Sequence, residues 1–111
     1  MKLYKKQSIF AQNVALLIQH IHSKVYDVTF GEAWRSAEQA AIYAREGKGI
    51  KDSLHCRRLA IDLNIFNATG VYLTDFDSYE PFGIYWESLH PLNRWGGKFK
   101  RVDCVHFEMQ D

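Results

Sequence analysis

Two short segments of this chain alternate between apolar and polar residues, and this alternation constrains the fold more than any other feature. The apolar positions are Leu59, Ile61, Leu63 and Ile65 in the first segment and Val105, Phe107 and Met109 in the second. Side chains along a strand point alternately to its two faces, so each segment predicts a strand with one core face and one polar face. The polar faces carry Asp62 and His106, which would lie on the same side of one sheet if the two strands pair.

The rest of the chain predicts helices and further strands around these two. We expect helices over residues 8–24, 36–46 and 81–89, strands over residues 25–30 and 71–73, and a loop over residues 93–97. Ser36 and Gln39 have the spacing of a capping box, which places the start of the second helix. This order of elements predicts an α+β fold, with a small antiparallel sheet and helices packed on one side of it.

Length and composition limit the class of protein. The chain has 111 residues, which fits a single domain spanning residues 1–111. Its net charge of +1 argues against a nucleic-acid-binding protein, and its longest apolar run, residues 14–18, is too short to span a membrane. Two cysteines are too few for a disulfide framework. No signal peptide is recognisable, so we expect a protein that is made in the cytoplasm. We also expect it to be a monomer.

The polar faces of the two strands carry residue types that bind zinc, Asp62 and His106, and His55 lies seven residues before Asp62. Three protein ligands with a fourth position left for water are typical of a catalytic zinc site, whereas a structural site is usually closed by four. The residues alone leave alternatives open. Asp62 and His106 could form an ordinary hydrogen-bonded pair, His90 is a rival ligand, and Cys104 could close the site as a fourth ligand.

Five motifs in a fixed order resemble a family of zinc peptidases. They are Ser53-Leu54-His55, Ala60-Ile61-Asp62 and Asp103-Cys104-Val105-His106, with an arginine-bearing segment over residues 31–39 and a segment over residues 85–97. Together they resemble the zinc peptidases that act on peptides containing D-amino acids, namely the D-Ala-D-Ala carboxypeptidases and dipeptidases and the phage L-alanyl-D-glutamate endopeptidases. The resemblance implies the fold that this family shares with lysostaphin-type enzymes and the hedgehog signalling domain.

The resemblance also implies the catalytic roles. His55, Asp62 and His106 would hold Zn²⁺, a metal that lowers the pKa of a water molecule to about 7 and polarises a peptide carbonyl. Asp103 would take the proton of the attacking water and pass it to the leaving amine. Because a regular strand would turn Asp103 toward the core, we expect it before the strand or at a bulge. Arg35 would donate to the oxyanion, and a surface salt bridge is its alternative role.

The resemblance further implies that Ser53, Gln39 and Trp95 contact the substrate. Ser53 could instead cap a turn. Aromatic side chains could line a groove for a peptide or sugar, although at least two of them would belong to the core; these are Trp34, Tyr79, Trp86 and Trp95.

Three positions in or near the motifs bear on how the site would work, and they are Glu108, Arg58 and Asp103. Glu108 shares a strand face with His106 and could either orient that imidazole or remain solvated. The chain has Arg58 where many family members have glycine, which puts the details of substrate binding in doubt. Asp103 stands where the dipeptidases have glutamate, and in this respect the chain is similar to the phage endopeptidases.

These observations predict a small zinc metallopeptidase that hydrolyses the stem peptide of peptidoglycan. Residues 85–97 resemble the short phage and prophage members, which favours an endolysin-like L-alanyl-D-glutamate endopeptidase that reaches the cell wall after release. One alternative is a D-Ala-D-Ala carboxypeptidase, for which Arg57, Arg58 and Arg94 are candidates to bind the terminal carboxylate. Another is a non-catalytic wall-binding or phage structural module on the same fold, against which Asp103 and Arg35 speak.

Overall fold

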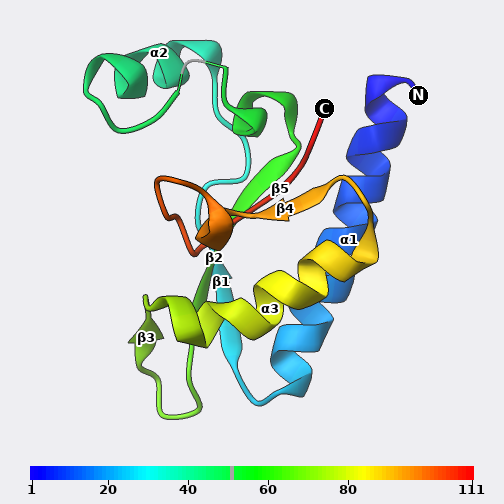
Figure 1. The fold of residues 1–111 in the computed structure, drawn as a ribbon, viewed down its shortest axis with the longest axis vertical. Helices are drawn as coiled ribbons and strands as arrows, with labels where there is room; N and C mark the ends of the chain where they lie inside the picture. Colours follow the sequence, from blue (N-terminus) through cyan, green and yellow to red (C-terminus); the bar gives the residue numbers. More distant parts are fainter. Residues whose placement is uncertain (51) are drawn as a thin grey trace.

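The computed structural model describes residues 1–50 and 52–111 (Figure 1). Its helices are α1 (Leu3–Ser23), α2 (Ala37–Arg45) and α3 (Phe76–Leu89), and its 3-10 turns are η1 (Leu54–Arg57) and η2 (Gly96–Lys98). Its strands are β1 (Asp27–Phe30), β2 (Ala60–Phe66), β3 (Tyr72–Leu73), β4 (Asn93–Trp95) and β5 (His106–Met109). The elements form the α+β architecture that the sequence predicts.

The strands form one antiparallel sheet in the order β1-β2-β5-β4, with β3 paired to β2. The predicted pairing of the two alternating segments is confirmed, because β2 and β5 are neighbours in this sheet. In their register Asp62 lies directly opposite His106, and Ala60 lies opposite Glu108. The two residues singled out on the polar faces are therefore cross-strand partners on one side of the sheet.

The hydrophobic core lies between the sheet and two helices, α1 and α3, which cross one another in Figure 1. Helix α2 stands apart from them, at the upper left of Figure 1. The core is built from one face of each element: Phe10, Val14, Leu17 and Ile21 of α1; Tyr79, Phe82 and Trp86 of α3; Ile61, Leu63 and Ile65 of β2; Phe107 and Met109 of β5. Each fully buried side chain of this size contributes about 1.5–3 kcal/mol of hydrophobic stabilisation. The other face of β2 and β5 is left for polar residues.

Helix α1 is the longest element, with 21 residues and one apolar face against the core. It starts five residues before the predicted boundary, in a polar stretch where the apolar periodicity has not yet begun. In the part of the chain that the structure describes, no helix combines the length and apolar character needed to cross a bilayer.

Two further elements differ from the sequence-based expectation. Helix α3 begins at Phe76 rather than at Pro81, because the Asp75 side chain caps it by accepting a hydrogen bond from the Ser78 N–H at 3.1 Å. Pro81 lies inside the helix and removes only one backbone donor. Strand β4 forms where we expected a loop. It is three residues long, too short for any periodicity, and it exists because β5 offers it an edge.

Candidate metal centre and catalytic cleft

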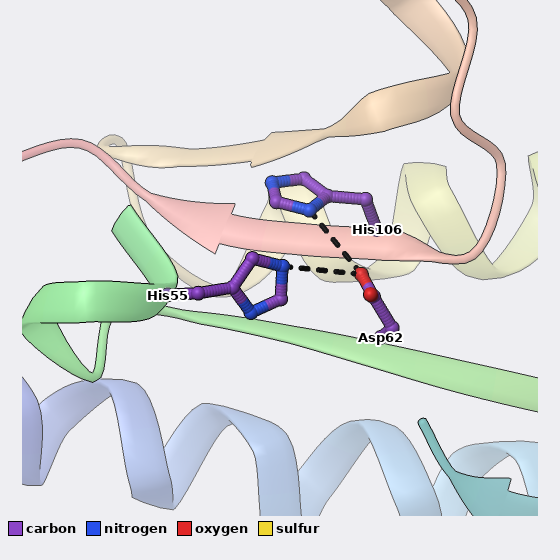
Figure 2. Close-up of side chains that lie close together, drawn as sticks. All are labelled: His55, Asp62 and His106. Atoms are coloured by element: carbon purple, nitrogen blue, oxygen red, sulfur yellow. Dashed lines mark ion pairs between the residues drawn. The ribbon is translucent and has the colours of Figure 1, made fainter. Parts of the chain in front are cut away.

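Three side chains from three different elements converge on the polar side of the sheet (Figure 2). His55 comes from η1, Asp62 from β2 and His106 from β5. The Asp62 Oδ1 atom lies 3.4 Å from His55 Nε2 and 3.3 Å from His106 Nδ1. One ligand atom from each residue lies within 4.8 Å of the others. The structure therefore brings together the three residues predicted to hold a metal.

The geometry and chemistry of this triad fit a zinc ion. Ligand atoms about 2.1 Å from a tetrahedral zinc lie about 3.4 Å from one another. The two distances to Asp62 Oδ1 match that spacing. Asp62 Oδ1 is buried and accepts a hydrogen bond from none of the described residues, so its contacts with the imidazoles are not hydrogen bonds. A buried carboxylate oxygen that accepts no hydrogen bond is costly, and a bound cation would satisfy it.

The local sequence holds His55 in a tight turn. Ser53 Oγ accepts a hydrogen bond from the His55 N–H at 3.2 Å and thereby caps η1. The turn ends at Arg58, which adopts a left-handed conformation with φ of 56°. That conformation favours glycine, which is the residue that many family members have at this position. Arg58 therefore carries a conformational cost that glycine would not. The turn leaves His55 only 2% exposed.

Two backbone hydrogen bonds hold Asp62 against the segment that follows β1. The Gly31 N–H donates to Asp62 O at 2.7 Å, and the Asp62 N–H donates to Glu32 O at 2.9 Å. A Cβ atom on Gly31 would lie 3.0 Å from Asp62 Cβ, which is tighter than ordinary side-chain packing. Glycine therefore allows the segment after β1 to lie directly against β2 at Asp62.

The orientation of His106 is fixed by Glu108, which lies two residues further along β5 on the same face. The His106 Nε2 and Glu108 Oε1 atoms are 2.7 Å apart, and both residues are buried. Arg94 of β4 in turn donates to Glu108 Oε2, with its Nε at 2.9 Å. A carboxylate on the far nitrogen of a histidine ligand sets the tautomer and the ring orientation. Of the two alternatives for Glu108, the structure selects contact with His106.

The buried charges shift one another's pKa values. Burial alone would raise the pKa of Asp62, but its contacts with His106 and His55 outweigh burial and lower it to about 2. Burial alone would lower the pKa of His106, but Asp62 and Glu108 outweigh it and raise the pKa to about 9. Burial would also raise the pKa of Glu108, but His106 and Arg94 outweigh burial and lower it. Without a metal, Asp62 and Glu108 are therefore ionised and the His106 imidazole is protonated.

Asp103 lies where we expected it, before the strand. The His106 N–H donates to Asp103 O at 3.1 Å, so these residues close a turn that leads into β5. The Asp103 Oδ2 atom is 4.0 Å from His106 Nδ1, and the side chain is half exposed. Burial, followed by the charge of Asp62, raises the pKa of Asp103. A carboxylate of raised pKa beside the triad is suited to accept a proton.

Glycine also permits this turn to form. A Cβ atom on Gly96 would lie 2.3 Å from Asp103 O and 2.9 Å from His106 Cβ. The Asp103 N–H donates to Gly96 O at 3.0 Å. The backbones around Gly96 and Asp103 thus approach more closely than any side chain would allow.

Arg35 faces the same cleft but has a partner already. Its Nε donates to Glu32 Oε1 at 2.5 Å, and its Nη2 contacts the same oxygen. The Arg35 N–H donates to His55 O at 3.3 Å, which ties the arginine to the turn of the metal site. Its Nη1 donates no hydrogen bond to any of the described residues. The salt bridge that we weighed as an alternative therefore exists, and it leaves one amino group of Arg35 for other contacts.

The triad lies in a cleft of about 880 Å³. The cleft is lined by the triad and by Asp103, Arg35 and Ser53, and it also has several cations on its rim. Ser53 therefore both caps η1 and faces the cleft, so both roles considered for it agree with its position.

Trp95 was predicted to contact substrate, and this prediction is wrong. Its side chain has no exposed surface, and its Nε1 donates to Cys104 O at 2.7 Å. Tyr79 and Trp86 are equally buried, whereas Trp34 is 51% exposed. Three of these four aromatic side chains thus belong to the core, because the small domain needs large side chains to fill it.

Other candidates also lie away from the triad. The Gln39 N–H donates to Ser36 Oγ, which confirms the helix cap, and Gln39 is absent from the described lining of the cleft. His90 Nδ1 accepts from the Leu92 N–H at 3.1 Å and closes a turn. Cys104 packs against the core, and among the described residues neither it nor Cys56 forms a disulfide. The alternatives that made His90 or Cys104 a ligand have no support in this geometry.

Comparison with known proteins adds to this picture. A protein-family model described as D-alanyl-D-alanine carboxypeptidase matches residues 46–109, which is more than half of the chain and includes the triad and Asp103. The structure is similar to that of the L-Ala D-Glu endopeptidase ChiX of Serratia marcescens, with a TM-score of 0.65 and 22% identity. That likeness covers 76% of this chain and 67% of the other, and it establishes the fold. No curated protein matches this chain. By its sequence match over residues 46–109, the chain belongs to the peptidase family described as D-alanyl-D-alanine carboxypeptidase.

Proposed function

We propose that this protein is a zinc-dependent peptidase that hydrolyses the stem peptide of bacterial peptidoglycan. The observation that carries the proposal is the convergence of His55, Asp62 and His106, with a buried Asp62 oxygen that lacks a hydrogen-bond donor. Family membership supports a peptidase, and the family description and the endopeptidase of similar fold both name activities on peptides of this kind. Release from the cytoplasm to the cell wall is part of the same proposal.

The chain's own residues suggest how hydrolysis would proceed. Zn²⁺ held by His55, Asp62 and His106 would supply a Lewis acid and a water molecule of lowered pKa. Asp103, at the edge of the triad, accepts the proton of the attacking water and delivers it to the leaving nitrogen. Its raised pKa and its half-exposed position suit both transfers. The Glu108 carboxylate holds the His106 ring in place throughout.

Arg35, which also lines the cleft, supports the reaction. Glu32 holds its guanidinium through Nε and Nη2, which leaves Nη1 for the developing oxyanion. One such donor is worth about 3–4 kcal/mol of transition-state stabilisation in other enzymes. The ion pair with Glu32 therefore fixes the arginine for this role.

We assign the cleaved bond as the one between L-Ala and D-Glu, in the manner of a phage or prophage endolysin. Support comes from Asp103 at the position of the general base, from the segment over residues 85–97 and from the fold shared with an L-Ala D-Glu endopeptidase. The family description favours a second candidate, a D-Ala-D-Ala carboxypeptidase. The two activities leave different products, so they can be separated directly.

Digestion of purified peptidoglycan, followed by mass spectrometry, tests this proposal. We expect a new amino terminus on D-Glu, with L-Ala left on the muramyl sugar, and a loss of turbidity in permeabilised Gram-negative cells. Free D-Ala as the only product would establish the carboxypeptidase instead. The zinc content of purified protein tests the ligand set. One equivalent in the wild type and its loss in His55→Ala and His106→Ala are expected, and full retention in both variants would show that the set is wrong.

A further inference from the structure

Among the described residues that line the cleft, one cation has neither a carboxylate partner nor a role in the proposed reaction. Four positively charged side chains line it in the described part of the chain, and three of them have carboxylate partners. The paired ones are Arg35 with Glu32, Arg94 with Glu108, and Lys48 with Glu46. Arg101 is exposed and forms no salt bridge with any carboxylate that the structure describes. Its positive charge is therefore available to an anion in the cleft.

Arg101 is nevertheless held in position. Its Nη1 donates to Gly47 O at 3.1 Å, a contact between segments 54 residues apart in the sequence. This bond joins the turn after α2 to the loop before β5, so both sides of the cleft meet at the arginine. The remaining donors of the guanidinium fork are free to bind a planar anion such as a carboxylate.

Asp103 lies two residues after Arg101, and their side chains line the same cleft. The charge of Arg101 acts on the Asp103 carboxyl and opposes the rise in its pKa, which places the two groups within electrostatic reach. In the reaction proposed above, Asp103 protonates the leaving nitrogen. A group bonded to the same carbon atom as that nitrogen would therefore lie beside Arg101.

Both candidate substrates carry a carboxylate on that carbon atom. In a D-Ala-D-Ala terminus it is the terminal carboxylate of the leaving residue. In the stem peptide D-Glu continues through its γ-carboxyl group, so its α-carboxylate is free. We propose that Arg101 binds the α-carboxylate of the leaving residue and makes the enzyme selective for substrates that carry it. This inference rests on the proposed function and adds the substrate feature that the cleft recognises.

The test compares two synthetic peptides that differ only at D-Glu, one with a free α-carboxylate and one with an α-amide. The zinc-loaded wild-type protein should cleave the carboxylate peptide with a kcat/KM about tenfold higher, the effect of one exposed charge-assisted hydrogen-bonded pair. In Arg101→Gln this preference should disappear through a higher KM for the carboxylate peptide. The amide peptide should lose far less kcat/KM than the carboxylate peptide, zinc content should match that of the wild type, and Arg101→Lys should keep part of the preference.

Lys100→Gln is the matched control, because it removes the same charge from the neighbouring exposed residue, which does not belong to the described lining of the cleft. It should keep the full preference. Equal cleavage of both peptides by the wild type, or an unchanged preference in Arg101→Gln, would overturn this inference and leave the proposed function standing. If the zinc-loaded wild type cleaves neither these peptides nor matched D-Ala-D-Ala peptides, the proposed function itself is wrong.

Discussion

Replacing Glu108 with glutamine should weaken zinc binding although Glu108 is not among the proposed ligands. The wild-type carboxylate lies 2.7 Å from His106 Nε2, and both side chains are buried. Neutralising it removes a charge that makes the imidazole a better metal ligand and that fixes which nitrogen carries the proton. The amide of glutamine can still accept a hydrogen bond, so Glu108→Gln separates the charge from the hydrogen bond.

The size of the effect follows from this geometry. Loss of such an outer carboxylate typically lowers metal affinity by about 10–100-fold. Because glutamine preserves an acceptor, we expect Glu108→Gln to lower zinc affinity by about tenfold, the lower limit of this range. Glu108→Ala should reach the upper limit, because it removes both the charge and the acceptor and also leaves Arg94 without its partner. A tenfold change corresponds to about 1.4 kcal/mol of binding free energy.

Competition with a chromophoric zinc chelator measures the dissociation constant of each variant. Glu87→Gln is the matched control, because Glu87 is also ion-paired, with Lys98, and accepts a hydrogen bond from the Trp95 N–H away from the triad. Its zinc affinity should equal that of the wild type, and urea unfolding identifies any variant that does not fold. An unchanged dissociation constant in a folded Glu108→Gln variant would refute the role assigned to Glu108.

Two further predictions concern turnover and stability. Asp103→Asn should keep zinc and the fold but lose about 10²–10⁴-fold in kcat, because it removes the base without removing a ligand; equal loss of zinc and activity would make Asp103 a ligand instead. Burial raises the pKa of Tyr79 to about 12, so its contribution to stability is complete below about pH 10 and is lost as the pH rises through 12. The urea midpoint of the wild type should fall between pH 9 and pH 11 more than that of Tyr79→Phe, and parallel curves would contradict this assignment.

Much of the candidate metal site could be predicted because strand geometry restricts it. Alternation placed Asp62 and His106 on polar faces, and pairing of β2 with β5 then set them opposite each other. His55 lies in a turn outside the strands, where periodicity carries no information, so the residues alone made it only a candidate and the resemblance to a family supported it. The position of Asp103 before the strand followed from the alternation of side chains along a strand. Within a regular strand Asp103 would share the face of Val105 and point to the core.

The residues that sequence reasoning misplaced depend on contacts between distant segments. The burial of Trp95 requires β4, a strand that forms only against β5 and that has no periodic signal of its own. The availability of Arg101 is likewise a tertiary property, because it depends on which carboxylates the other cations of the cleft reach. The cap at Asp75 could have been found, because aspartate is one of the residues that typically cap the start of a helix.

The division of the site between sheet and loops indicates how bond selection can be separated from metal binding. Asp62 and His106 are paired across two central strands whose opposite faces are buried in the core, so neither can move without disturbing the packing. Asp103 and Arg101 lie in the loop before β5, and Arg35 lies between β1 and α2. Substitutions in these loops can alter which substrate groups are recognised while the triad keeps its geometry.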